Sequence, residues 1–103
     1  MNKTIYFINL FDYYGDLLTK KQQDYFKDYY FDNLSLQEIG DNLKISRNAI
    51  HKSIKSIVNK LYFYEDKLKL YYKTSKILDI IDSCDNLMIK DEIKNILEDD
   101  YNE

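Results

Sequence analysis

One short segment of the chain carries side chains with the chemistry that contact with a polynucleotide requires. A guanidinium can make a forked contact with guanine or phosphate, an amide can pair with adenine, and lysine ammonium groups neutralise phosphates. At helical spacing, Ala49, Ile50 and Ile54 fall on the opposite face of the same segment. We therefore interpret the polar residues as the outward face of a DNA-contacting helix, with an ordinary solvated face as the alternative. The residues are Arg47, Asn48, His51, Lys52 and Lys55.

Two helix starts precede this segment and predict how it is positioned. Ser35 is followed three residues later by Glu38, which is the spacing of a capping box at the start of a short helix. Ser46 is an N-cap for a further helix that begins at Arg47. A turn is expected between the two helices, at residues 43–46. Residues 34–57 thus have the organisation of a helix-turn-helix motif.

Gly40 stands in the middle of the first motif helix, where glycine costs about 1 kcal/mol relative to alanine. We expect a small residue here because the second motif helix crosses closely. The first helix should turn Leu36, Ile39 and Leu43 toward the core.

The rest of the chain also reads as helical. It has no proline and only two glycines, so little interrupts a helix. Apolar spacing predicts a helix from about 3 to 18, and Thr19 with Gln22 forms a capping box for a second helix that ends near 32–33. The expected fold class is all-α: residues 1–103 form a single domain, with the motif at 34–57 and a long-helix extension with an acidic terminal helix at 58–103.

Beyond the motif, apolar residues recur at alternating spacings of three and four, which is typical of a helix that packs along one seam. The pattern predicts one rod over 47–82, about 54 Å long at 1.5 Å per residue. A three-helix domain cannot cover such a rod, so we expect a returning helix around 89–97 and a second chain, in a homodimer. The seam consists of Ile50, Ile54, Ile57, Leu61, Tyr64, Leu68, Tyr71, Ser75 and Leu78.

Charge is distributed unevenly along the chain. The formal net charge is -3, but residues 44–76 hold nine basic and two acidic side chains, whereas residues 77–103 hold two basic and nine acidic ones. A basic block that begins at the turn of the motif is where contact with phosphates is expected. The acidic end could compete for that block or simply solvate a terminal helix.

Several classes of function find no support in the sequence. His51 is the only histidine and Cys84 the only cysteine, so no metal site is expected. No catalytic cluster or glycine-rich phosphate loop is present, and we expect neither an enzyme nor a cofactor. The absence of a signal sequence or a long apolar run favours a cytoplasmic protein without membrane contact.

Several motifs together resemble the YlxM-like family of small bacterial helix-turn-helix proteins over residues from about 4 to 72. They are "LFDYY" with "LLT" and "KQ" near the start, "LSLQEI" before the motif, "SRNAI" at the second motif helix and "YEDKL" further along.

This resemblance implies a fold like the fourth, DNA-reading region of bacterial sigma factors. The genes of the family commonly neighbour those of the signal recognition particle, so the resemblance implies a regulatory role connected with protein targeting. The alternative function is an interaction module that binds the protein or RNA of the signal recognition particle through the long helix. Aromatic side chains that alternate with lysines around 60–73 could stack unpaired RNA bases, although helix packing explains them as well.

Overall fold

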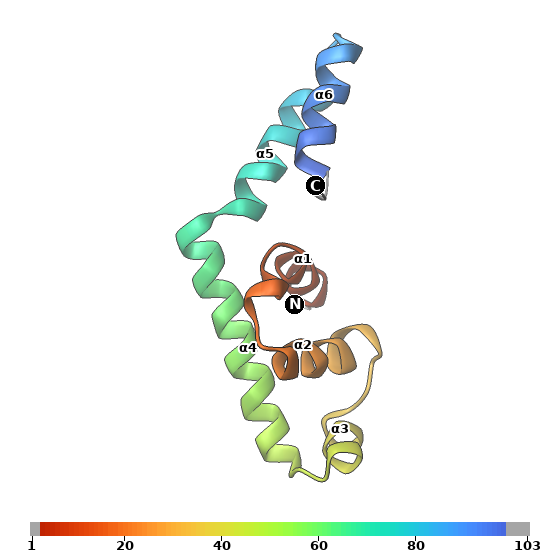
Figure 1. Cartoon of the computed structure of the whole chain (residues 1–103), viewed down its shortest axis with the longest axis vertical. Helices are drawn as coiled ribbons and strands as arrows, with labels where there is room; N and C mark the ends of the chain where they lie inside the picture. The colour runs from red at the N-terminus through yellow and green to blue at the C-terminus, as the bar shows by residue number, and fades with distance from the viewer. Residues whose placement is uncertain (1–2, 99–103) are drawn as a thin grey trace. The chain divides into compact units, whose positions relative to one another are not determined.

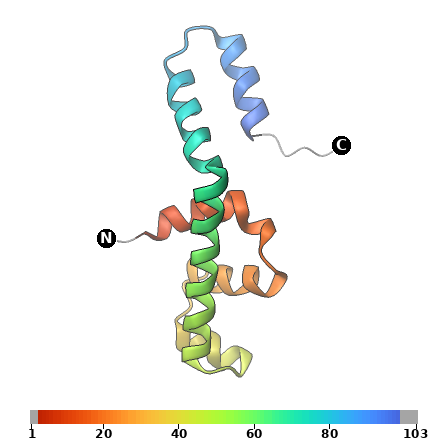
Figure 2. The ribbon, with the colours of Figure 1, turned by 90° about the vertical axis from the view of Figure 1, so that its left-hand side faces the viewer.

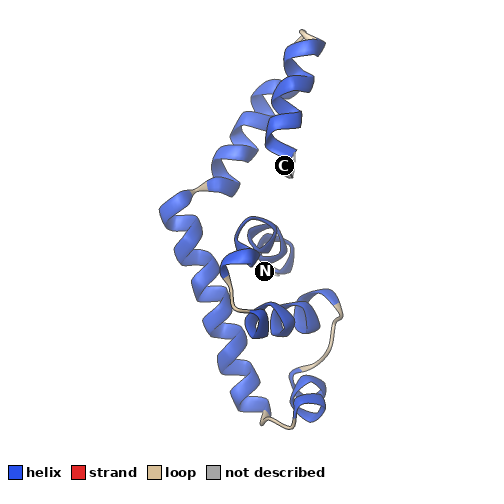
Figure 3. Ribbon diagram, viewed as in Figure 1, coloured by secondary structure: helices blue, strands red, loops and turns tan. Residues whose placement is uncertain are grey.

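The computed structural model describes residues 3–98, which contain six α-helices and no strand (Figure 3). The predicted all-α fold class is therefore confirmed. The chain divides after Leu68 into two compact units, described separately below. Unit 1 contains α1 to α4 and unit 2 contains α5 and α6. The helices are α1 Thr4–Tyr14, α2 Lys20–Phe26, α3 Leu36–Leu43, α4 Arg47–Leu68, α5 Leu70–Asp82 and α6 Leu87–Glu98.

The first two helices begin and end close to where the sequence predicts. α1 stops at Tyr14 and a single 3-10 turn, Gly15–Leu17, follows it. The capping box is present: the Gln22 amide N–H donates to Thr19 Oγ1 at 3.1 Å, and the Thr19 amide donates to Gln22 Oε1 at 3.0 Å. α2 continues into a π-helical turn, Lys27–Phe31, just before the predicted end.

Unit 1 is built around α4, against which α1, α2 and α3 pack on one side (Figures 1 and 2). Phe11 and Phe26 stack with ring centroids 4.3 Å apart. Fully burying a large apolar side chain contributes about 1.5–3 kcal/mol, so a core of this size holds α4 firmly. The largest fully buried side chains are Tyr14, Phe26, Leu10, Ile39, Ile50, Ile57 and Leu61.

The predicted seam on α4 is correct as far as Leu61 and wrong after it. Tyr64 is only half-buried, whereas Glu65 is buried and its carboxylate accepts a hydrogen bond from the Tyr14 phenol at 2.5 Å. A straight α-helix has 3.6 residues per turn, so its inward face drifts away from a strict heptad. Because Leu61 is fully buried inside unit 1, it is not available as part of a seam with a second chain.

The predicted single helix over 47–82 is also wrong. Lys69 has φ 56° and ψ 30°, the left-handed conformation, and separates α4 from α5. Residues 66–70 are all exposed, so no packing holds the helix continuous where the core of unit 1 ends. The rod of 36 residues therefore becomes two helices in two units.

Unit 2 is a pair of helices with little interior. Ile81 is its one buried apolar residue among those described, and Ile93 and Leu97 of α6 are half-buried. The predicted returning helix exists, but it covers only part of its apolar surface, because Ile89 and Ile96 remain 48% and 64% exposed. An ion pair joins Lys94 to Asp82 across the two helices at 3.7 Å.

Candidate nucleic-acid interface

The helix starts on both sides of the turn are fixed by side-chain caps. The Glu38 amide donates to Ser35 Oγ at 3.0 Å, and the Ser35 amide donates to Glu38 Oε1 at 3.0 Å, which is the predicted capping box of α3. At the start of α4, the Ala49 amide donates to Ser46 Oγ at 3.1 Å, so Ser46 is the N-cap. Each cap satisfies backbone N–H groups that a helix end leaves unpaired.

The turn lies where it is predicted, and Lys44 is its left-handed C-cap, with φ 58° and ψ 43°. The amide N–H groups of Lys44 and Ile45 both donate to the carbonyl oxygen of Gly40, at 2.9 Å for Ile45. A β-carbon on Gly40 would lie 2.6 Å from the carbonyl oxygen of Ile45. A small residue is needed here, as expected, but the close neighbour is the backbone of the turn rather than the crossing helix.

The five predicted site residues, Arg47, Asn48, His51, Lys52 and Lys55, are all exposed on α4. On the opposite face, Ile50 and Ile54 are buried and Ala49 is half-buried, which matches the predicted inward face. The structure thus places the five side chains on the first turns of one helix, all of them exposed.

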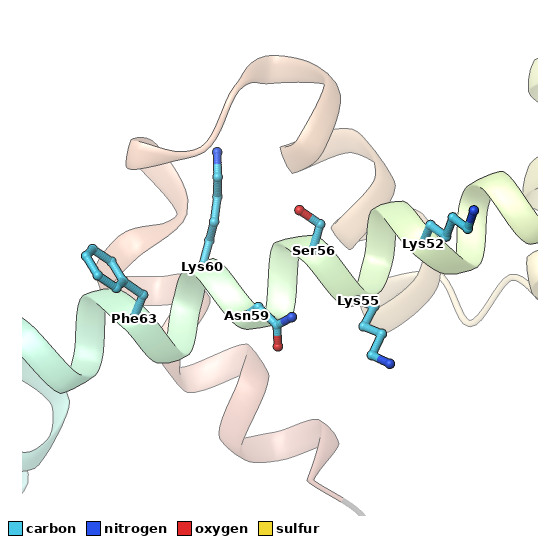
Figure 4. Close-up of a pocket in the computed structure, with 6 residues that line it drawn as sticks. All are labelled: Lys52, Lys55, Ser56, Asn59, Lys60 and Phe63. Atoms are coloured by element: carbon cyan, nitrogen blue, oxygen red, sulfur yellow. The ribbon is translucent and has the colours of Figure 1, made fainter.

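The basic surface continues along α4 beyond the predicted residues. A shallow hollow on the outer side of α4 is lined by Lys52, Lys55, Ser56, Asn59, Lys60 and Phe63. Figure 4 shows Lys52, Ser56 and Lys60 projecting to one side of the helix, and Lys55 and Asn59 to the other. The spacing of four residues explains this row, because residues i and i+4 lie on the same helix face.

A second groove lies between α2 and α4. Its lining includes Lys52, Ser53 and Ser56 from α4 and Lys21 and Tyr25 from α2, with Thr19 and Gln22 at the start of α2. The Lys21 ammonium lies 5.8 Å from the centroid of the Tyr25 ring. A spacing of four residues in the sequence could have predicted that Ser56 and Lys60 lie in line with Lys52. No sequence pattern predicts that Lys21 lies beside α4.

The other elements around the turn also carry acidic groups, which on α2 lie beside Lys20 and Lys21. α3 carries Glu38 and Asp41, both exposed, and no basic residue. Asp24 and Asp28 line a hollow between α2 and the turn, together with Leu43, which is 42% exposed rather than inward as predicted. Burial, with Asp32 and Asp24 adding to it, raises the pKa of the Asp28 carboxyl. Phosphates near the motif would therefore be attracted by α4 and not by α3.

The described residues also bear on two other kinds of site. Between residues 3 and 98, no cluster of histidine, cysteine and acidic side chains could hold a metal ion. In the same range, no helix is both long and apolar enough to cross a membrane.

The capped helix, the left-handed turn and the second capped helix with an exposed outer face define a helix-turn-helix protein. A family model described as "Putative helix-turn-helix protein, YlxM / p13 like" matches residues 1–100. The chain belongs to this family, UPF0122, as its resemblance to YlxM-like proteins indicates.

Individual relatives agree with this assignment. A UPF0122 protein of Malacoplasma penetrans is 53% identical over 62% of this chain and 60% of its own length. One of Fusobacterium nucleatum is 39% identical over 87% of each chain. A third, of Halalkalibacterium halodurans, is 36% identical over 95% of this chain and 94% of its own.

Proposed function

We propose that this protein is a non-catalytic, cytoplasmic regulator that binds duplex DNA through the first turns of α4. The observation that carries the proposal is the joint exposure of Arg47, Asn48, His51, Lys52 and Lys55 on a helix that is anchored by its opposite face. A helix-turn-helix reads bases with the N-terminal part of its second helix. Arg47 and Asn48 are the residues in that position with base-reading chemistry, and Lys52 and Lys55 have phosphate-binding chemistry.

The test is the double substitution Arg47→Ala with Lys52→Ala. We expect DNA affinity to fall at least tenfold in a gel-shift or anisotropy titration, while the helical circular dichroism signal stays the same because both side chains are exposed. Lys27→Ala with Lys67→Ala removes the same charge from exposed positions of unit 1 and is the matched control. Equal affinities for the two double variants would contradict the recognition-helix assignment.

The active form is proposed to be a homodimer, held together by unit 2. Ile80, Leu87, Met88 and Ile96 are 64–77% exposed there, an unusual fraction for side chains of this size. A dimer also suits a helix-turn-helix protein, because two copies can read two half-sites.

Sedimentation tests the dimer with the pair Ile80→Asp and Ile96→Asp. Burying two unpaired carboxylates in an interface costs several kcal/mol, so these changes should shift the protein toward monomer. Asn95→Asp, an exposed polar position on α6, is the control and should leave the dimer intact. A wild-type protein that sediments as a monomer at every concentration excludes the homodimer.

A regulatory link to the signal recognition particle is supported by the family resemblance. A second candidate function, binding of structured RNA through α4, is favoured by one observation: Phe63 is 57% exposed at the edge of the lysine-lined hollow. Exposed aromatic rings among basic groups stack unpaired bases. Titrating duplex DNA and a structured RNA in parallel separates the two functions, and Phe63→Ala should weaken binding of the RNA only.

A further inference from the structure

We propose that the groove between α2 and α4, together with the row Lys52, Ser56 and Lys60, is a track for the backbone phosphates of duplex DNA. The inference rests on the proposed function and adds to it a contact surface outside the motif, above all Lys21 of α2. The track supplies affinity that does not depend on base sequence, whereas Arg47 and Asn48 read bases.

The charge of the lining is the first argument. The groove and the adjoining hollow share Lys52 and Ser56, so they form one continuous surface. Its charged groups, among the described residues that line it, are four lysines and no carboxylate: Lys21, Lys52, Lys55 and Lys60. The whole chain carries 18 acidic residues against 15 basic ones, so a lining without a carboxylate does not follow from the composition. Lys21 also lines the neighbouring hollow that contains Asp24 and Asp28.

The state of the lysines is the second argument. Lys20, next to Lys21, is held by Asp24 at 2.7 Å as an i,i+4 ion pair on the surface of α2. Lys21 instead lies over the Tyr25 ring, and in the described part of the chain no ion pair involves Lys21, Lys52 or Lys60. These ammonium groups can therefore bind a phosphate without first breaking an ion pair with a carboxylate.

The neighbouring groups are the third argument. The Ser53 and Ser56 side chains line the groove together with the lysines. Hydroxyl groups commonly donate hydrogen bonds to phosphate oxygens in protein–DNA contacts. The row Lys52, Ser56 and Lys60 extends about 12 Å along α4 at 1.5 Å per residue, which is long enough to meet more than one phosphate of a strand. Figure 4 shows this row on a single side of the helix.

The experiment measures how the dissociation constant depends on salt, with a labelled mixed-sequence duplex at about 50 and about 200 mM salt. Each phosphate contact contributes about 0.9 to the slope of log affinity against log salt, or about a 3.5-fold change over this range. Lys21→Gln with Lys60→Gln should therefore lower the slope by about 1.8, so that the loss of affinity between the two salt concentrations becomes about twelve times smaller. Lys20→Gln with Lys27→Gln, which removes the same charge from α2 and its continuation, should leave the slope unchanged.

The outcomes separate the track from the proposed function. Equal slopes for the two double variants overturn the track, whether both fall or neither does. If Arg47→Ala with Asn48→Ala has no effect on affinity while the Lys21 and Lys60 variant loses its salt slope, the base-reading assignment fails and the track stands. A wild-type protein that binds no duplex overturns both, and a loss of slope confined to a structured RNA hairpin assigns the surface to RNA instead.

Discussion

Units 1 and 2 are both made of amphipathic helices, yet they differ in how much of their apolar surface is buried. Unit 1 has a core of fully buried side chains from all four of its helices, whereas unit 2 has Ile81 as its one described buried residue. Met88 of unit 2 is 77% exposed, while Leu61 of unit 1 is 0% exposed. Two helices present too few faces to enclose a core, so unit 2 retains exposed apolar surface.

The difference also separates two kinds of task. The candidate interface stands on α4, whose inner face is locked into the core of unit 1, so its side chains are presented by a rigid support. Unit 2 has no comparable support and offers instead an apolar surface suited to association. The four predictions that follow test or refine this contrast, beginning with the largest expected effect.

Truncating one apolar side chain in each unit is expected to give the largest difference in the free energy of unfolding. Leu61→Ala removes a fully buried side chain and should lower the free energy of unfolding by about 2–5 kcal/mol. In the dissociated monomer, Met88→Ala removes a side chain that is already exposed and should change this free energy by no more than about 0.5 kcal/mol. Urea unfolding followed by circular dichroism measures both. Equal losses would show that unit 2 depends on its apolar side chains as much as unit 1 does.

Filling Gly40 tests how tightly the motif closes. The new β-carbon of Gly40→Ala meets the Ile45 carbonyl oxygen at 2.6 Å, and backbone cannot move aside cheaply, so a loss of about 1–3 kcal/mol is expected. Gly15→Ala, whose β-carbon meets only the Phe11 ring at 3.1 Å, is the comparison and should cost less. Thermal unfolding ranks the two variants, and the reverse order would contradict this account of the turn.

Two lysines in the left-handed conformation, one inside unit 1 and one at the boundary between the units, are positions where substitution by glycine should stabilise the protein. Lys44 and Lys69 have φ 58° and 56°, a conformation that glycine adopts without the steric cost of a β-carbon. Lys44→Gly and Lys69→Gly should each raise the free energy of unfolding by up to about 1 kcal/mol. Lys55→Gly, in the interior of α4, is the control and should lower it by about 1 kcal/mol.

A pH-dependent effect in unit 1 is expected to be the smallest. Because the folded-state pKa of Asp28 is raised above its ordinary value of 3.8, the folded state binds that proton more tightly than the unfolded state does. The corresponding stability is present below pH 3.8 and is lost as pH rises through the folded pKa. Asp28→Asn should therefore be slightly more stable than wild type at neutral pH, an advantage that disappears in acid. Asp12→Asn, exposed on α1, is the control in the same unfolding series.

Local sequence signals predicted much of the fold and the motif. The two capping boxes, the cap at Ser46 and the turn around Lys44 are all found where the pattern places them. Such features depend on hydrogen bonds within a few residues, so they can be recognised from spacing. The outward face of α4 followed in the same way from helical periodicity, although contact of its residues with DNA remains a prediction.

Features that depend on distant parts of the chain could not be predicted in this way. The heptad continued past Leu68 without any local signal for a break, and only the end of the packed core explains why Lys69 leaves the helix. Glu65 lies outside the predicted seam, yet it is buried, and Tyr14, 51 residues earlier, donates a hydrogen bond to its carboxylate. A carboxylate can be buried when it is paired in this way, and its partner lies on another helix.

The sequence by itself determined the helical class, the capped ends of the motif and the polar face of α4, because these properties are encoded in neighbours three or four residues apart. Tertiary structure decided which apolar faces are covered, where α4 ends, and that Lys21 of α2 lies in the same groove as Lys52 of α4. Those outcomes depend on contacts between residues far apart in the chain, whose approach is set by packing of the whole core rather than by local spacing.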